Sequence, residues 1–246
     1  MQRFHIAFGA CLLVPLAARA GVILSVEAPA VQTSQVSGVV TEDFDSFATG
    51  NYLSLPTAVG NFTALSPGLK IIPADRFGGA GGGGQYFVVG LSTGTTQADL
   101  DLGFGTPQAY VGMWLSALDA SNVIELYSGG LLVASYDAPT VHASLPAIYN
   151  GNPNVPFLGQ DASEPFAYLN FIGTGGTTFD TVRFKNSLVS GLEIDNISIR
   201  FDALSEPFPG SIISGGITTV PLPSAIIGGA PLLGVLIAMK VRRRRA

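Results

Sequence analysis

Cysteine and histidine are scarce in this chain of 246 residues, and the scarcity restricts the chemistry that it can perform. The only cysteine is Cys11, and the only histidine beyond residue 20 is His142. Transition-metal sites draw mainly on these two side chains, so the sequence argues against such a site. A body without cysteine forms no disulfide and must be stabilised by a packed core, which about 200 residues are enough to supply.

Positive charge is also scarce, and most of it lies at the two ends. Of the 12 lysines and arginines, two lie within residues 1–20 and five within 240–245, whereas all 17 acidic residues lie within 21–219. The five remaining basic residues leave 21–219 with a net charge of −12. Nucleic acids and anionic membranes bind proteins through positive charge, so neither is expected as a partner of this part. Divalent cations and neutral glycans stay open as ligands.

Residues 1–20 are predicted to be a secretory signal peptide. Arg3 supplies the positive n-region, and an apolar stretch follows from Ile6 to Ala18. Small residues at Ala18 and Ala20 satisfy the cleavage rule, so signal peptidase is expected to cut after Ala20.

The last 27 residues have the composition of a membrane-directed tail. Residues 225–239 carry no charge, and Lys240 and the cluster Arg242, Arg243, Arg244 and Arg245 follow. The uncharged stretch reaches the ~20 residues of a transmembrane helix only if residues 220–224 are included. Retention of the arginines on the cytoplasmic side would place the body outside. The tail is therefore either a permanent single-helix anchor or a processed signal.

The order of features in this tail resembles the PEP-CTERM sorting tail in its Val-Pro-Leu-Pro-Ala (VPLPA-CTERM) variant. The motif is Val220, Pro221, Leu222, Pro223 and Ser224, with serine where alanine is usual. The resemblance implies a temporary anchor in the inner membrane that an exosortase recognises and cleaves near the motif.

Between Gly21 and about Asp202 the sequence is typical of β-structure throughout. Short runs rich in Val, Ile, Tyr, Phe and Thr alternate with Gly, Pro, Asn and Asp clusters, and no segment keeps a 3.6-residue period. The pattern predicts one all-β domain over 21–204, an antiparallel β-sandwich of jelly-roll type. Residues 205–219 are predicted to be a linker that holds the sandwich away from the membrane. The clearest predicted strands are 22–26, 86–91, 110–115, 123–127, 131–136, 168–172 and 192–201.

Two predicted strands contain a break in their apolar alternation. In 192–201 the apolar positions are even up to Ile194 and odd from Ile197, which predicts a β-bulge at Asp195-Asn196. A similar slip falls between Phe179 and Val182. If 186–191 is a hairpin loop, the two bulges lie opposite each other on paired strands.

Several short motifs of the body look like those of secreted PEP-CTERM β-sandwich proteins. That resemblance implies exported surface or matrix material of Gram-negative bacteria that make exopolysaccharide, with no established reaction and no catalytic residues. The motifs are Phe44–Phe47, Gly78–Gly82, Trp114–Asn122, Tyr149–Pro153, Ala167–Phe171 and Gly191–Asn196.

Two motifs have the letters of known catalytic or binding loops. Gly90 to Gly94 matches Gly-x-Ser-x-Gly around Ser92, but an apparent strand follows where a nucleophile elbow needs a helix. The glycine run 79–84 satisfies Gly-x-Gly-x-x-Gly, but it also leads into a strand. Neither a serine hydrolase nor a nucleotide site is predicted, and the glycine run is interpreted as a mobile surface loop.

The oxygen-rich side chains leave weaker hypotheses. Calcium could be bound by Asp180, Asp195 and Asn196 at the proposed bulges, or by Asp119, Asn122 and Glu125, although these residue types also favour bulges and turns for backbone reasons. Either of two carboxylate pairs, Glu193 with Asp195 or Asp43 with Asp45, has a spacing compatible with glycoside hydrolysis. Glycan could stack on an exposed aromatic side chain: Trp114, Tyr110 or Tyr149.

The function predicted from the sequence is that of a non-enzymatic exported protein without a cofactor. It would be anchored briefly in the inner membrane, sorted by an exosortase, and placed on the cell surface or in a matrix of exopolysaccharide. The alternatives are a permanently anchored β-sandwich that binds glycan or calcium and, third, a glycan hydrolase.

Overall fold

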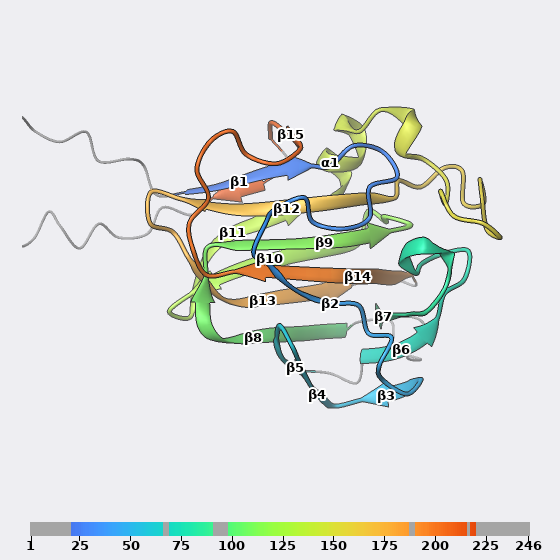
Figure 1. Ribbon diagram of the computed structural model, residues 1–246, viewed down its shortest axis with the longest axis horizontal. Coiled ribbons are helices and arrows are strands. Elements are labelled where there is room, and N and C mark those ends of the chain that lie inside the picture. The colour runs from blue at the N-terminus through green and yellow to red at the C-terminus, as the bar shows by residue number, and fades with distance from the viewer. Residues whose placement is uncertain (1–20, 66–68, 91–97, 187–189, 216, 220–246) are drawn as a thin grey trace, which may run out of the picture.

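The computed structural model describes residues 21–65, 69–90, 98–186, 190–215 and 217–219. Within these ranges the chain forms two antiparallel β-sheets packed face to face (Figure 1), which confirms the predicted all-β sandwich. The predicted signal peptide and the predicted tail lie outside the described residues. Among the described residues, no helix is long and apolar enough to cross a membrane.

The described strands divide into a nine-stranded and a seven-stranded sheet. The order in the nine-stranded sheet is β15 (Ser211–Ile212), β1 (Gly21–Val26), β12 (Ala167–Thr174), β9 (Tyr110–Ser116), β14 (Gly191–Arg200), β7 (Gln85–Gly90), β6 (Leu69–Pro73) and β3 (Gly50–Tyr52), with β2 (Val40–Glu42) paired to β14. The order in the seven-stranded sheet is β16 (Ile217–Thr219), β11 (Leu131–Asp137), β10 (Asn122–Ser128), β13 (Phe179–Asn186), β8 (Ala98–Gln108), β5 (Gly60–Ala64) and β4 (Ser54–Thr57).

Each of the seven clearest predicted strands begins within one residue of an observed strand. The sequence pattern did not indicate the short helix α1 (Ala138–Ser144) or the 3-10 turns η1 (Ala80–Gly82) and η3 (Ala147–Tyr149). A helix of two turns is too short to reveal a 3.6-residue period.

The core lies between the sheets and is built from alternate residues of the strands. Its centre is a cluster of four buried phenylalanines, whose contacting rings meet edge to face with centroids 5.1 to 5.8 Å apart. Edge-to-face pairs of this kind stabilise a core by about 0.5–1.5 kcal/mol each beyond their buried area. The four residues are Phe44, Phe62, Phe87 and Phe184.

The other face of the nine-stranded sheet is buried as well, because residues 27–39 cross over it (Figure 1). Polar side chains fill this second interface. Asn170 donates to Glu27 Oε1 at 3.0 Å and accepts from the Tyr110 hydroxyl at 2.6 Å, and that hydroxyl is 2.7 Å from Ser34 Oγ. Strand β9 is consequently buried at every residue, so it lacks the alternation of a strand with one solvated face.

The predicted bulge at Asp195-Asn196 is confirmed. Against β9, Asp195 pairs with Trp114 and Ser198 pairs with Gly112, so β14 contains one extra residue. Asn196 has a φ of 47°, a left-handed conformation that asparagine tolerates better than most residues. The second slip is also present, between Phe179 and Thr181, but the extra residues lie on the partner strand β8.

The predicted pairing of these two strands is wrong. Strand β13 belongs to the seven-stranded sheet and β14 to the nine-stranded sheet, so the chain crosses between sheets after Asn186 instead of forming a hairpin. The alternation of each strand fits either arrangement, because both strands bury one face in the same core.

Residues 205–219 are not a free linker, in contrast to the prediction. Strand β15 pairs with β1, and β16 pairs with β11, so this segment extends one edge of each sheet. Ile213 is buried in the core, and the Ser25 hydroxyl donates to the carbonyl of Pro209 at 2.6 Å. The Pro, Gly and Ser content suits an irregular segment fixed to a sheet edge as well as a spacer.

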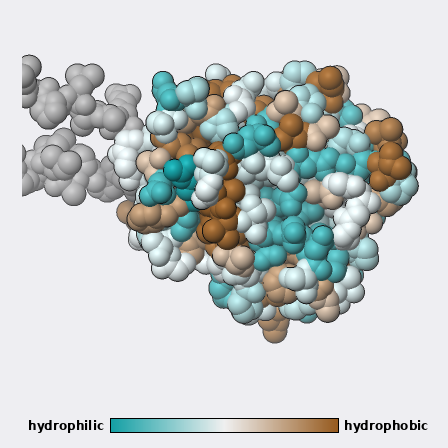
Figure 2. Space-filling view, viewed as in Figure 1, coloured by the Kyte–Doolittle hydropathy of each residue, from teal (hydrophilic) through white to brown (hydrophobic). Residues whose placement is uncertain are grey.

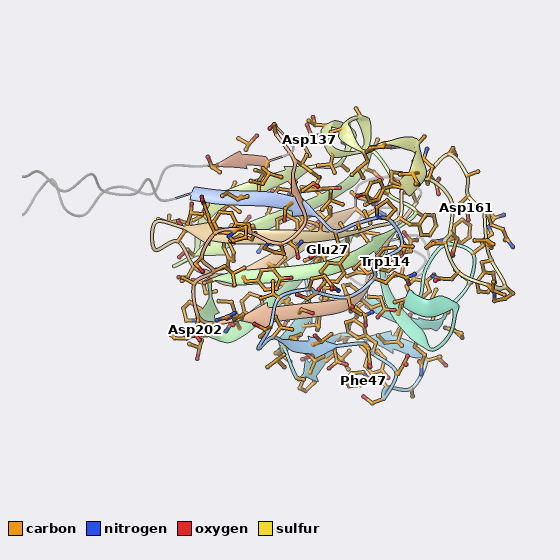
Figure 3. All side chains as sticks on the ribbon, turned by 45° about the horizontal axis from the view of Figure 1, so that its top comes forward. Glu27, Phe47, Trp114, Asp137, Asp161 and Asp202 are labelled. Atoms are coloured by element: carbon orange, nitrogen blue, oxygen red, sulfur yellow. The ribbon has the colours of Figure 1, made fainter. Side chains whose placement is uncertain are left out.

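The strand registers define two ends of the sandwich. Gly21 at the start of β1 pairs with Thr174, and β16 runs from Ile217 to Thr219 toward the same end. We call this the terminal end; it is at the left of Figures 1 and 3, and Asp202, labelled in Figure 3, lies there. The opposite end, with Asp161 in Figure 3, carries the connections 74–84 and 145–166 and is called the loop end.

Candidate functional site

The candidate site is an open cavity toward the loop end, with a volume of about 340 Å³. Its lining combines three carboxyl groups with amide side chains and the glycine run. We call it the carboxylate pocket, and its residues are Gln32, Thr33, Asp43, Asp45, Ala80, Gly81, Gly83, Asp195 and Asn196.

The bulge in β14 positions the deepest carboxyl group. Asp195 is 3 % exposed, and its two oxygens accept from the backbone N–H groups of Ala80 and Asn196, each at 2.7 Å. The side chain of Asn196 donates to the Gln32 carbonyl at 2.9 Å. The extra residue in the strand therefore fastens both the glycine run and the crossing segment to the sheet.

The glycine run forms one wall, and backbone geometry explains its composition. Gly81, Gly82 and Gly84 have φ values of 70° to 72°, which side chains disfavour. A Cβ at Gly84 would clash with Asp45 Oδ1, and a Cβ at Gly82 would clash with the carbonyl of Val155. The Gly81 N–H donates to Gln32 Oε1 at 2.6 Å. Strand β7 follows the run, as predicted, so the phosphate-binding strand–loop–helix context is absent here.

The two shallower carboxylates lie on the connection after β2. Asp45 Oδ1 accepts from the Gln85 N–H at 2.7 Å, and Asp43 Oδ1 accepts from the Asp45 N–H at 3.2 Å. Both residues are exposed, so their free lone pairs face solvent.

Burial is the main cause that raises the pKa of Asp195 to about 7; its two backbone hydrogen bonds oppose the rise, and the nearby Asp45 and Asp43 add to it. Near neutral pH the pocket therefore contains a carboxyl group that can hold a proton beside two solvent-facing acidic groups. Such a group donates a hydrogen bond when protonated and accepts one when ionised. The pocket can thus pair with the hydroxyl groups of a polyol in both directions.

Glu193, the predicted partner of Asp195, shares its face of the sheet but does not line the pocket. It lies opposite Ser116 and is 6 % exposed. Burial, followed by the charge of Asp119, raises its pKa well above the usual value for glutamate. Its Oε2 has no hydrogen-bond partner among the residues that the structure describes.

The structure overturns the prediction that Trp114 stacks on sugars. Its side chain is 1 % exposed and lies within the body, packed with Phe166, Tyr168 and Ala80 (Figure 3). Tyr110 is fully buried, and Tyr149 is 8 % exposed and donates to the Glu27 carbonyl. These aromatic side chains are covered because the outer face of the nine-stranded sheet is itself an interface.

The predicted calcium ligands are not brought together. Asp180 lies on β13 in the seven-stranded sheet and accepts from the Gly129 N–H, whereas Asp195 and Asn196 lie on β14 in the other sheet. Across the described ranges, no group of three or more His, Cys, Asp or Glu side chains could hold a metal ion.

The alternative calcium ligands Asp119, Asn122 and Glu125 have structural partners. Asn122 accepts from the Asp119 N–H at 2.8 Å and so closes a turn, while Glu125 pairs with Lys185 at 3.3 Å. The structure brings no calcium site together at this position.

The remaining motif and signal predictions fall on parts of the chain that the structure does not describe. Ser92 lies within residues 91–97, which the structure does not describe. Strand β8 begins directly after them, at Ala98. His142 lies on α1. The cleavage residues Ala18 and Ala20, the motif 220–224 and the arginines 242–245 are likewise outside the described residues, so these predictions stand as predictions.

The sequence indicated each carboxylate pair separately, but not that Asp43, Asp45 and Asp195 share one cavity. It gave no signal for Gln32, because this residue reaches the site through a crossing segment that has no regular secondary structure. Of the features that build the pocket, only the bulge could be located from the sequence, because it interrupts the alternation of apolar residues.

Comparison with known proteins gives no family for this chain: no family model and no curated protein matches it. Among solved structures, it is similar to the catalytic domain of a GH87 alpha-1,3-glucanase, seen in complex with nigerose and in complex with tetrasaccharides. Identity is 12 % in both cases, the TM-scores are 0.34 and 0.30, and 70 % and 78 % of this chain are covered. The chain spans 30 % of the length of each of those proteins, and a likeness at this level supports no conclusion about function.

Proposed function

We propose that this chain is a non-enzymatic exported protein of the cell surface or extracellular matrix, anchored briefly by its tail and sorted by an exosortase. The observation that carries the proposal is the direction of the chain at both boundaries of the body. Gly21 and Thr219 both face the terminal end, so a single membrane-facing end would accommodate the signal peptide and the tail. We further propose jelly-roll connectivity, because consecutive strands repeatedly alternate between the two sheets.

Intact-mass analysis of the protein recovered from a host that contains an exosortase tests this proposal. The expected product begins at Gly21 and lacks the arginine cluster 242–245. A variant in which Pro221 and Pro223 are both replaced by alanine should retain the tail, while Pro209→Ala is the matched control outside the motif. A mature wild-type protein that still carries Arg242–Arg245 would contradict processing and favour a permanent anchor.

Binding of a neutral saccharide in the carboxylate pocket is a second candidate function. The specific observation in its favour is the convergence of Asp43, Asp45 and Asp195 with two amide side chains in an open cavity. An ionised carboxylate accepts hydrogen bonds, and an amide side chain both donates and accepts them. Together these groups can pair with sugar hydroxyls in both directions. Because the aromatic side chains considered above are buried, binding would depend on these hydrogen bonds and not on ring stacking.

A glycan array compared between the wild type and Asp45→Asn tests this second function. Loss of binding is expected for Asp45→Asn but not for Asp180→Asn, which removes an acidic group from the other sheet. Equal binding by all three proteins would refute a role for the pocket. Release of reducing ends from a bound glycan, abolished by Asp195→Asn with the fold retained, would instead indicate a hydrolase.

A further inference from the structure

A groove at the terminal end opens to solvent and is lined by apolar side chains together with three threonines and Glu206. It lies between residues 175–178, which connect β12 in one sheet to β13 in the other, and the segment after β14, and its volume is about 500 Å³. Phe201 on its rim is 61 % exposed. Figure 2 shows hydrophobic side chains on the left half of this face, toward the terminal end, and a further group at its right edge. Its large apolar residues are Ile23, Phe201, Leu204 and Phe208.

A neighbouring hairpin adds a second exposed apolar side chain at the same end. Leu131 follows the turn between β10 and β11 and is 54 % exposed. The register of β10 with β13 places this turn beside Phe179, near the start of β13 and therefore at the terminal end. Large apolar side chains are also exposed at the loop end, among them Ile148, Val155 and Leu158, so exposure alone does not distinguish the terminal end as a contact surface. The direction in which the chain leaves the body does distinguish it.

The described part of the chain ends at the terminal end of the body. Thr219 is the last residue of β16, and the sequence continues directly into Val220 and the motif. An extended chain advances at most ~3.5 Å per residue, so the six steps from Thr219 to Ala225 reach about 20 Å. A tail anchored from Ala225 onward would thus keep the terminal end within about 20 Å of the hydrocarbon layer, beyond which the polar headgroup region extends for about 5–8 Å.

The charges beside the groove decide which kind of surface it fits. Glu206 lines the groove, and the exposed Asp202 follows Phe201 directly. Both groups would be repelled by anionic lipids, whereas a zwitterionic surface accepts apolar side chains without that penalty. Phenylalanine and leucine are side chains that insert at the boundary between headgroups and acyl chains.

We propose that the groove and Leu131 form a docking surface for a zwitterionic lipid bilayer, which the body contacts while its tail spans the membrane. This inference rests on the proposed function, because it requires the tail to be anchored. It assigns a role to the packing of 205–219 on the body: this packing shortens the connection to the tail, so the terminal end stays near the lipid and the loop end, with the carboxylate pocket, points away from it.

Site-specific fluorescence on the full chain tests the proposal. In a Cys11→Ser background, a single cysteine is introduced by Phe201→Cys or, as the matched control at the loop end, by Leu158→Cys, whose native side chain is 65 % exposed. Each variant is labelled with an environment-sensitive fluorophore and reconstituted in phosphatidylcholine vesicles with or without lipids that carry a nitroxide quencher. Emission of the single tryptophan, Trp114, verifies that each variant remains folded.

The expected result is a blue shift and strong quenching at position 201, with neither at position 158. A chain that floats with the vesicles but shows equal, weak quenching at both positions would overturn the docking surface while leaving the anchor intact. Failure to float with the vesicles would refute the anchor, and with it both proposals. Energy transfer between labels at position 201 that is independent of lipid would show that a second copy covers the groove, which also overturns the proposal.

Discussion

The substitution Asp195→Asn should remove a large part of the pH dependence of stability. Folding raises the pKa of Asp195 from 3.8 to about 7, so between these values the folded protein binds more protons than the unfolded chain. Stability therefore falls as the pH rises from about 4 to about 7, and the loss is complete above that range. A shift of roughly three units corresponds to about 4 kcal/mol, an upper bound because the cavity is open to water.

The Asp195→Asn substitution also lowers stability through an effect that does not depend on pH. Asparagine keeps one acceptor oxygen, but its NH₂ group would face the N–H of either Ala80 or Asn196, which leaves a buried donor unpaired at about 1–3 kcal/mol. We therefore expect Asp195→Asn to have a lower free energy of unfolding than the wild type near pH 4. The difference between the two proteins should become smaller as the pH rises to 8.

Urea denaturation of residues 21–219 at a series of pH values measures this effect. Trp114 is the only tryptophan and is buried, so its emission reports unfolding. Glu193, whose pKa is also raised, contributes a slope of the same sign to both proteins, and the difference between the two proteins isolates Asp195. Parallel stability curves for the wild type and Asp195→Asn between pH 4 and 8 would refute the reasoning.

Three further predictions concern the packing. Gly84→Ala should lower the melting temperature, because it strains a φ of 70° and clashes with Asp45, at a cost of about 1–3 kcal/mol, whereas Gly83→Ala enters open space and should change little. Phe87→Ala should cost about 3–5 kcal/mol in urea titrations, against less than about 0.5 kcal/mol for Leu53→Ala, whose side chain is 74 % exposed. Deletion of 205–219 should destabilise the body by several kcal/mol, since it uncovers the core and two sheet edges; an unchanged melting temperature would mean that this segment is only a linker.

The docking proposal and the corrected linker concern the same physical feature. A free spacer would let the body turn independently of an anchored tail, whereas the pairing of this segment with β1 and β11 sets the end of the body at which residue 219 lies. The deletion of 205–219 and the fluorescence experiment therefore test this feature independently, one through stability and the other through contact with lipid.

The sequence by itself determined the class of fold, the position of most strands and the bulge in β14. These follow from local properties: β-branched and aromatic runs, turn residues, and an alternation that breaks when one residue is inserted. The acidic, cysteine-free composition of 21–219 is likewise a property of the sequence alone.

Only the tertiary structure decided which strands pair, which faces are covered, and which side chains meet. Trp114 was predicted to be exposed because a β-strand usually has one solvated face, but residues 27–39 cover that face here. Asp180 and Asp195 were predicted to be neighbours if residues 186–191 formed a hairpin loop, but the chain crosses to the other sheet there. Long-range coverage and pairing depend on the whole chain and leave no period in the local sequence, so the carboxylate pocket and the groove became visible only in the folded protein.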